Sequence, residues 1–249
     1  LSLIPFPTDK IFDTELHTFD VVIFQNFDYR PYRMARYLPN IRDAVRDGLG
    51  FVMLGGPQSF AGGGYRGTAI EEILPVQLDQ PGTVESPAQL TLTPVGLVHP
   101  ITQLGRNKLS ELWQDLPAWP RVNTTGPLNP DASVLVNATS KDSRVQAMPL
   151  ISVSEVGKGR TMAISSDSMW RWRFSDSQDG GASERAYHRF WSNSLRWLVR
   201  DPEHARVQVL PTRYRFETNS TASASVRVLN QDYQPAGNRP VRVTLFRSG

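Results

Sequence analysis

Two short apolar runs separated by a helical periodicity form the first strong pattern along the chain. Residues 20–25 (DVVIFQ) contain four successive apolar residues, and residues 51–54 (FVML) are all apolar, which is typical of strands buried on both faces of a parallel sheet. Between them, apolar residues recur at three- and four-residue spacing and predict one face of a helix that Gly48 ends, namely Met34, Tyr37, Leu38, Ile41 and Val45. Strand, helix and strand within about 35 residues match a βαβ unit. We therefore expect two parallel strands at the centre of a doubly wound α/β domain.

Strand and helix patterns continue to alternate as far as residue 202. Further strands are predicted at residues 89–94, 134–137, 150–156 and 161–165, and further helices at 68–73, 109–116 and 186–198. The short turn Gly157-Lys158-Gly159 joins two of these strands, which predicts an antiparallel hairpin. We assign residues 1–202 to one α/β domain with a mostly parallel sheet.

A different pattern begins at Arg206. Apolar and polar residues now alternate, as expected for half-buried antiparallel strands, at Val207 and Val209, at Ala224, Val226 and Val228, and at Val241, Val243 and Leu245. A β-sandwich needs roughly 100 residues, so we interpret residues 206–249 as a truncated, Ig-like all-β segment. We expect the chain to be a piece of a longer protein.

Composition excludes several kinds of chemistry. The 249 residues contain no cysteine, which excludes disulfides, thiolate metal sites and cysteine nucleophiles. Lys and Arg number 27 against 24 Asp and Glu, and they are spread along the chain, so we expect no nucleic-acid partner. The four histidines are scattered, and we predict neither a metal nor a cofactor. No apolar run approaches the roughly 20 residues that cross a bilayer.

The glycine-rich loop GGPQSFAGGGY (residues 55–65) follows the apolar run 51–54 directly. Parallel sheets bind ligands at the carboxyl ends of their strands, so we predict a ligand site that includes Gly55, Gly56, Gln58 and Ser59. Gly62, Gly64 and Gly67 also spell the dinucleotide fingerprint, but a true fingerprint begins at the strand end. A glycine loop without nucleotide is the alternative, as is a purely turn-capping role for Ser59 and Gln58.

The segment DSMWRWRF, residues 167–174, follows the predicted strand 161–165 and is a second candidate part of the ligand site, opposite the glycine loop. Asp167, Trp170 and Arg171 would face the glycine loop and could bind a sugar, a carboxylate or a peptide by stacking and ion pairing. In an extended segment Trp170 and Trp172 would point the same way. The alternative is that the tryptophans are packed and the arginines are solvated.

Three segments carry a resemblance to a known family: FVMLGGPQSFAGGGYRGT, GKGRTMAISSDSMWRWRF and YHRFWSNSLRWLVRDPE. They resemble the domains called putative glutamine amidotransferases, over roughly residues 1–202. The resemblance implies the class I glutamine amidotransferase fold with a flavodoxin-like sheet. It also implies a large bacterial membrane-anchored protein with von Willebrand A and β-sandwich domains, facing the periplasm or the cell exterior. The expected partners are the other domains of that chain, with the membrane reached only through flanking segments.

The sequence departs from this family pattern at the catalytic positions. Active class I enzymes place a cysteine after the strand matched by residues 51–54, and a His and a Glu after a late strand. Here residues 55–59 read GGPQS and residues 166–169 read SDSM. We therefore expect a non-catalytic module that binds a small polar ligand or a protein partner.

Two other functions remain open at the level of sequence. In a divergent hydrolase or amidotransferase, Ser59 or Asp167 would act, with His99 or His188 as the base. A structural spacer would need none of them. Three Asn-X-Ser/Thr sites, at Asn123, Asn137 and Asn219, matter only if the source secretes through a glycosylating pathway.

Overall fold

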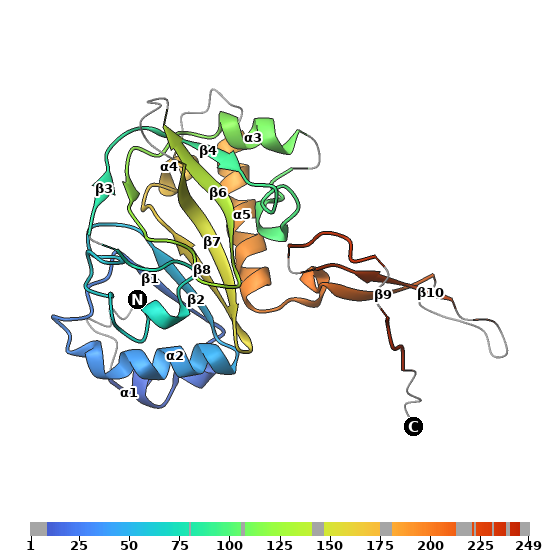
Figure 1. The fold of residues 1–249 in the computed structure, drawn as a ribbon, viewed down its shortest axis with the longest axis horizontal. Helices are drawn as coiled ribbons and strands as arrows, with labels where there is room; N and C mark the ends of the chain where they lie inside the picture. The colour runs from blue at the N-terminus through green and yellow to red at the C-terminus, as the bar shows by residue number, and fades with distance from the viewer. Residues whose placement is uncertain are drawn as a thin grey trace. The chain divides into compact units, whose positions relative to one another are not determined.

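The chain forms two compact units, Leu1–Asp201 and Pro202–Gly249. The computed structural model describes residues 9–79, 81–105, 108–140, 147–174, 181–212, 221, 223–230, 232–237 and 240–244. Figure 1 shows the larger unit as a central sheet with helices on both sides.

The sheet of the larger unit has six strands in the order β1-β2-β8-β7-β6-β4. Their bounds are β1 Val21–Gln25, β2 Gly50–Leu54, β8 Gly159–Ile164, β7 Met148–Val156, β6 Ala132–Ser140 and β4 Ala88–Leu92. Strands β1, β2 and β8 pair in parallel, whereas β7 is antiparallel to β8, β6 to β7 and β4 to β6. Strand β6 therefore runs in the direction of β1, β2 and β8, and only β7 and β4 are reversed. The mostly parallel sheet, its βαβ unit and the β7–β8 hairpin agree with the sequence prediction. Burial on both faces is confirmed for β2 but was wrong for β1, because β1 is the edge strand and its Ile23 is 44% exposed.

Helices cover both faces because the side chains of β2 alternate between them. Phe51 and Met53 belong to the core that includes Ile41 and Val45 of α2 (Leu38–Asp47). On the opposite face, a Cβ built on Gly50 would lie 3.1 Å from the Cβ of Leu198 in α5 (Ala182–Leu198). The absence of a side chain at Gly50 thus lets α5 approach the sheet closely.

Short elements complete the larger unit: α1 Asp9–Asp13, η1 Leu16–Thr18, η2 Met34–Tyr37, η3 Glu71–Ile73, β3 Thr83–Val84, η4 Pro100–Thr102, α3 Leu109–Asp115, β5 Val122–Asn123 and α4 Trp170–Arg173. The helix predicted at 68–73 is only the 3-10 turn η3. Strands β3 and β5, which the sequence did not predict, form a separate antiparallel pair.

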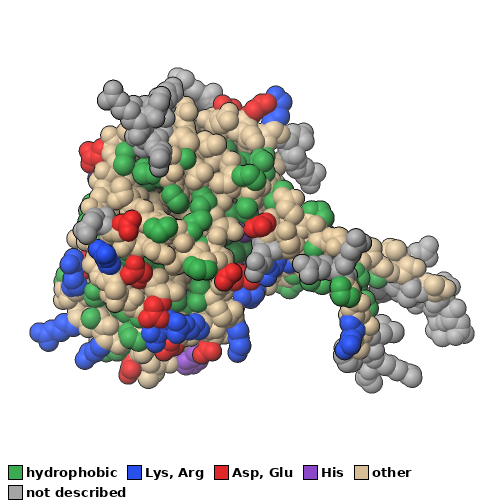
Figure 2. Space-filling model, viewed as in Figure 1, with side chains coloured by type: hydrophobic (Ala, Val, Ile, Leu, Met, Phe, Trp, Pro, Cys, Tyr) green, Lys and Arg blue, Asp and Glu red, His purple; other side chains and the backbone are tan. Residues whose placement is uncertain are grey.

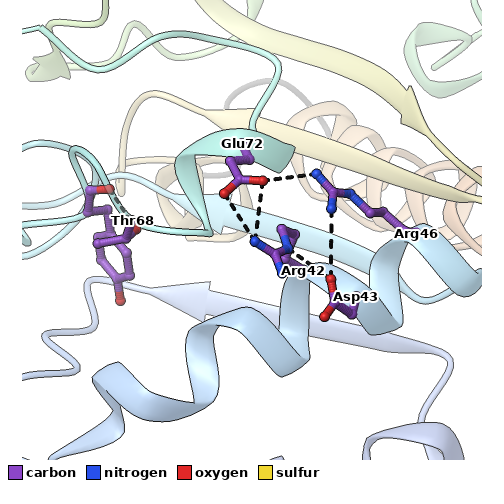
Figure 3. A network of polar contacts seen from close by, with 6 residues as sticks. Arg42, Asp43, Arg46, Thr68 and Glu72 are labelled. Atoms are coloured by element: carbon purple, nitrogen blue, oxygen red, sulfur yellow. Dashed lines mark hydrogen bonds and ion pairs between the residues drawn. The ribbon is translucent and has the colours of Figure 1, made fainter.

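A polar network ties η3 to α2 (Figure 3). Arg42 and Arg46 of α2 both bind Glu72, at 3.1 and 2.9 Å, and Asp43 pairs with both arginines. Each pair is partly exposed, so each contributes at most about 1 kcal/mol. The network holds the segment after the glycine loop against α2.

Charges of both signs lie side by side over α1 and α2 on the face shown in Figure 2. Such mixing matches the small net charge of +3.

The smaller unit contains η6 (Pro202–His204) and an antiparallel pair of strands, β9 (Val207–Pro211) and β10 (Ala224–Val228). Two of the three alternating runs, around Val207 and Val226, therefore mark paired strands. Val241 and Val243 lie in no strand, which corrects the expectation there, and Leu245 lies outside the described residues. A complete β-sandwich remains a prediction. Among the described residues of both units, every helix is too short or too polar to cross a membrane.

Candidate ligand-binding site

The glycine loop begins where β2 and β8 end side by side. The amide of Gly55 donates to the carbonyl of Ile164 at 2.8 Å, which extends the pairing beyond β2. A Cβ built on Gly55 would lie 2.5 Å from the nitrogen and 2.6 Å from the Cα of Ser166. Only glycine fits there, because the neighbouring backbone cannot move aside as a flexible side chain could.

Two asparagines fix the loop to its surroundings. The Asn123 side chain accepts from the Gly56 amide at 2.8 Å and donates to the Gly56 carbonyl at 3.0 Å. The backbone amide of Asn123 also donates to the Ser165 carbonyl at 2.7 Å, so β5 bridges the ends of β2 and β8. Across the loop, Asn26 accepts from the Gln58 amide at 2.8 Å. The loop is therefore held in one conformation by hydrogen bonds on both sides.

Ser59 is buried within this loop rather than displayed by it. Its residue is only 1% exposed, and its hydroxyl donates to the Leu54 carbonyl at 2.5 Å. Its amide donates to the Gly56 carbonyl at 3.1 Å. The hydroxyl proton is thus used to close the turn after β2, which matches the turn-capping interpretation. Gln58 lies beside it on the surface.

Two tyrosines anchor the far end of the loop. Tyr65 donates to the Phe27 carbonyl at 2.7 Å, and Tyr29 donates to the Gly64 carbonyl at 3.0 Å. Burial raises the pKa of the Tyr65 phenol, so it stays neutral.

Asp167 lies at the carboxyl end of β8 and faces Arg121, which precedes β5. One Arg121 amino nitrogen is 3.5 Å from Asp167 Oδ2, and the Ser168 hydroxyl donates to Asp167 Oδ1 at 3.3 Å. The Ser166 hydroxyl donates to the Arg121 carbonyl at 2.6 Å. The carboxylate is partly exposed and is weakly held by long contacts.

His99 does not meet Ser59 or Asp167. It is buried, its Nδ1 accepts from the Ile101 amide at 3.3 Å, and its ring packs edge-on against Trp197 at 5.3 Å. The Trp197 carbonyl is bound by Arg160, the second residue of β8. His99 therefore lies near the amino ends of the strands, whereas Ser59 follows the carboxyl end of β2. His188, the other candidate base, is exposed on α5 and lies 3.7 Å from Glu184. The Ser59 hydroxyl binds the Leu54 carbonyl instead of a histidine, so the Ser-His-Asp arrangement considered from sequence is not formed.

The segment after Asp167 is helical, not extended, which corrects the expectation that its two tryptophans point the same way. In α4, residues two apart lie on nearly opposite sides. Trp170 is 54% exposed, and the Arg171 guanidinium lies 5.8 Å from its ring centroid. Trp172 is fully buried in an aromatic cluster with Trp113, Trp119 and Phe190. The expected second part of the ligand site is thus divided into an exposed Trp170–Arg171 pair and a packed Trp172.

A cavity of about 390 Å³ lies beside the glycine loop. One wall is the loop from Pro57 to Gly62, and the other consists of β3, β5 and their flanking residues, including Glu85, Arg121 and Thr124. Of the predicted site residues, Gly55, Gly56, Gln58 and Ser59 do not line the cavity, and Asp167 contacts its lining residue Arg121. Trp170 and Arg171 are not among the residues that line it.

The described part of the chain holds no group of three or more His, Asp or Glu residues placed to bind a metal ion. The polar groups around the cavity are amides, hydroxyls, one guanidinium that can only donate and one carboxylate that can only accept. Such a set suits an organic ligand held by hydrogen bonds.

Sequence reasoning missed three residues of this site: Asn26, Arg121 and Asn123. From sequence, Asn123 was noted only as part of a glycosylation motif, yet it is 6% exposed and both the oxygen and the nitrogen of its side-chain amide are hydrogen-bonded. The two-residue strand β5 is too short for a periodic signal, so nothing in the local pattern places Asn123 beside Gly56.

The fold and the site define a flavodoxin-like α/β domain with an amidotransferase-like loop after β2. The chain belongs to the family described as putative glutamine amidotransferase, whose family model matches residues 15–200.

Solved structures share this fold. The cytoplasmic protein STM3548 from Salmonella typhimurium is similar with a TM-score of 0.57 and 22% identity, over 78% of this chain and 76% of that one. The cytoplasmic protein STM1381 from Salmonella typhimurium LT2 has a TM-score of 0.51 and 20% identity, over 74% of each chain. At such identities the likeness concerns the fold alone. Comparison with curated proteins gives no significant match.

Proposed function

We propose that this domain is a non-catalytic member of its family that binds a small polar ligand or a partner in the cleft beside the glycine loop. The observation that carries the proposal is the state of the loop. It is fixed by Asn26 and Asn123 next to a cavity, while its one serine hydroxyl, that of Ser59, is buried and hydrogen-bonded to Leu54. A preformed, rigid cleft is what a binding site requires.

The lack of cysteine and the state of Ser59 support the non-catalytic part of the proposal. The chain has no cysteine, and an activated serine needs a base within hydrogen-bonding reach. Ser59 instead donates to a backbone carbonyl, and His99 lies near the other end of the strands. Neither arrangement activates an oxygen for attack.

The wider setting is proposed from the family resemblance. We place the domain in an exported, membrane-anchored bacterial protein, on the periplasmic or extracellular side, with its neighbouring domains as partners. Fractionation of cells that produce the full-length protein, followed by protease protection of spheroplasts, tests this placement.

Ammonia release from glutamine and a panel of small amides tests the absence of catalysis. We expect the wild-type domain to release no more ammonia than Ser59→Ala and Asp167→Asn, once each variant is shown to fold. Release that disappears in Ser59→Ala would instead establish a serine hydrolase, and release that disappears only in Asp167→Asn would give that role to the carboxylate.

Binding is tested by NMR of the ¹⁵N-labelled domain against a fragment library. The proposal expects ligands that shift the amide signals of Gly56 and Gly62 in a saturable way. A library that leaves both signals unmoved, together with no catalysis, would favour a spacer domain.

A further inference from the structure

We propose that the cleft takes a monocarboxylate, anchored by Arg121. The inference rests on the proposed binding function of the same cleft and names the chemistry of its ligand. Arg121 is the one basic side chain among the described residues that line the cavity of about 390 Å³.

The Arg121 guanidinium has most of its hydrogen-bonding capacity unused. Its side chain is 39% exposed, and its contact with Asp167 is 3.5 Å long, at the outer limit of a hydrogen bond. Its Nε is buried and has no partner among the described residues. A guanidinium offers five N–H donors, so the exposed amino groups are open to a stronger acceptor.

The geometry of guanidinium favours a carboxylate as that acceptor. Its planar fork pairs with the two oxygens of a carboxylate through parallel hydrogen bonds. Further donors line the same cavity: the hydroxyls of Thr83 and Thr124, and the amides of Ala61 and Gly62, which donate no hydrogen bond within the described residues. Pro57, Phe60 and Ala61 add apolar surface for a short carbon chain.

The charges around Arg121 limit the ligand to one negative charge. Glu85 lies at the exposed edge of the cavity, and Asp167 already faces the guanidinium. A phosphate dianion or a dicarboxylate would place its second charge near these two carboxylates, where like charges repel. A monocarboxylate meets the guanidinium without that cost.

Asp167 competes with the ligand for Arg121, and this competition gives two opposite expectations. Arg121→Gln removes the anchor and should weaken carboxylate binding about 10-fold or more, the usual effect of losing hydrogen bonds to a charged group. Asp167→Asn removes the competitor and should strengthen binding about 3- to 10-fold. A general loss of folding would weaken binding in both variants, so the opposite signs identify the site.

The experiment is an NMR titration of the whole chain with sodium propionate, disodium succinate, inorganic phosphate and propionamide, following the Gly56 and Gly62 amides. We expect propionate to bind more tightly than the other three probes, with the order of affinity Asp167→Asn, wild type, Arg121→Lys, Arg121→Gln. Arg66→Gln is the matched control, because Arg66 is exposed and makes no hydrogen bond within the described residues, and it should leave the affinity unchanged.

Three results would overturn the inference. Propionamide binding as tightly as propionate would show that charge is irrelevant. An unchanged affinity in Arg121→Gln, with folding confirmed by urea denaturation, would show that Arg121 does not anchor the carboxylate. Fragments of this size are expected to bind with a Kd in the millimolar range. If no carboxylate shifts the signals at concentrations up to about 50-fold above such a Kd, carboxylates are excluded as ligands. The binding function itself would survive each of these if neutral fragments still shift the Gly56 and Gly62 signals.

Discussion

Replacing Asn123 by alanine should destabilise the larger unit through a single backbone residue, Gly56. The Asn123 side chain satisfies both the amide and the carbonyl of Gly56, and both residues are buried. Each buried polar group left without a partner costs about 1–3 kcal/mol. We therefore expect the free energy of unfolding to fall by about 2–6 kcal/mol, a large share of the roughly 5–15 kcal/mol typical of a domain.

Asn123→Asp provides a second, graded test. Aspartate keeps an acceptor for the Gly56 amide but turns a second oxygen toward the Gly56 carbonyl, 3.0 Å from the present donor. It should therefore be destabilising too, and less so at low pH, where the carboxyl group carries a proton to donate.

Urea denaturation followed by tryptophan fluorescence measures these changes. Asn137→Ala is the control, because Asn137 is partly exposed and its side chain makes no hydrogen bond within the described residues. It should change the free energy of unfolding by less than about 1 kcal/mol. If Asn123→Ala falls within the same range with an unchanged m-value, the account of a loop held by Asn123 is refuted.

Further predictions concern packing and pH. Gly55→Ala should lower the free energy of unfolding by about 1–3 kcal/mol, because the added Cβ would meet backbone atoms. Gly237→Ala, with open space around it, is the control and should be near neutral. Equal thermal shifts in the two variants would contradict this prediction. Trp172→Ala should lose about 3–5 kcal/mol and Trp170→Ala less than about 1 kcal/mol, measured by urea denaturation. A similar loss of unfolding free energy in both variants would refute the description of Trp170 as exposed and Trp172 as packed. Because the pKa of Tyr65 is raised by burial, its contribution to stability is fully present below the unfolded pKa of about 10 and is lost as the pH rises above it. Tyr65→Phe should therefore show a smaller decline in unfolding free energy above about pH 9.5, and parallel declines in the two proteins would be evidence against it.

Strong periodicity made the central sheet predictable from sequence. The runs at 20–25 and 51–54 became β1 and β2, and the spacing of Ile41 and Val45 marked the buried face of α2. These signals depend only on which faces are buried, and a buried face repeats along the chain.

The candidate site was less predictable because its key contacts are long-range. Asn123 and Gly56 are 67 residues apart, and neither belongs to a periodic segment that would reveal the contact. The aromatic segment was misjudged for a different reason: four residues are too few for alternation to distinguish an extended strand from one helical turn, so Trp170 and Trp172 were expected to share a side. The position of the glycine loop at a strand end could be predicted, whereas what holds and lines it could not.

The burial of Asn123 also bears on how the protein can be produced. Asn123-Thr124-Thr125 is a glycosylation motif, and in a eukaryotic secretory host such motifs are modified on chains that have not yet folded. A glycan on Asn123 would occupy the amide nitrogen that binds Gly56 and could not be accommodated in the buried site. Mass spectrometry of protein secreted by such a host should therefore find the folded fraction unmodified at this asparagine. Production in a bacterial host avoids losing chains to this modification.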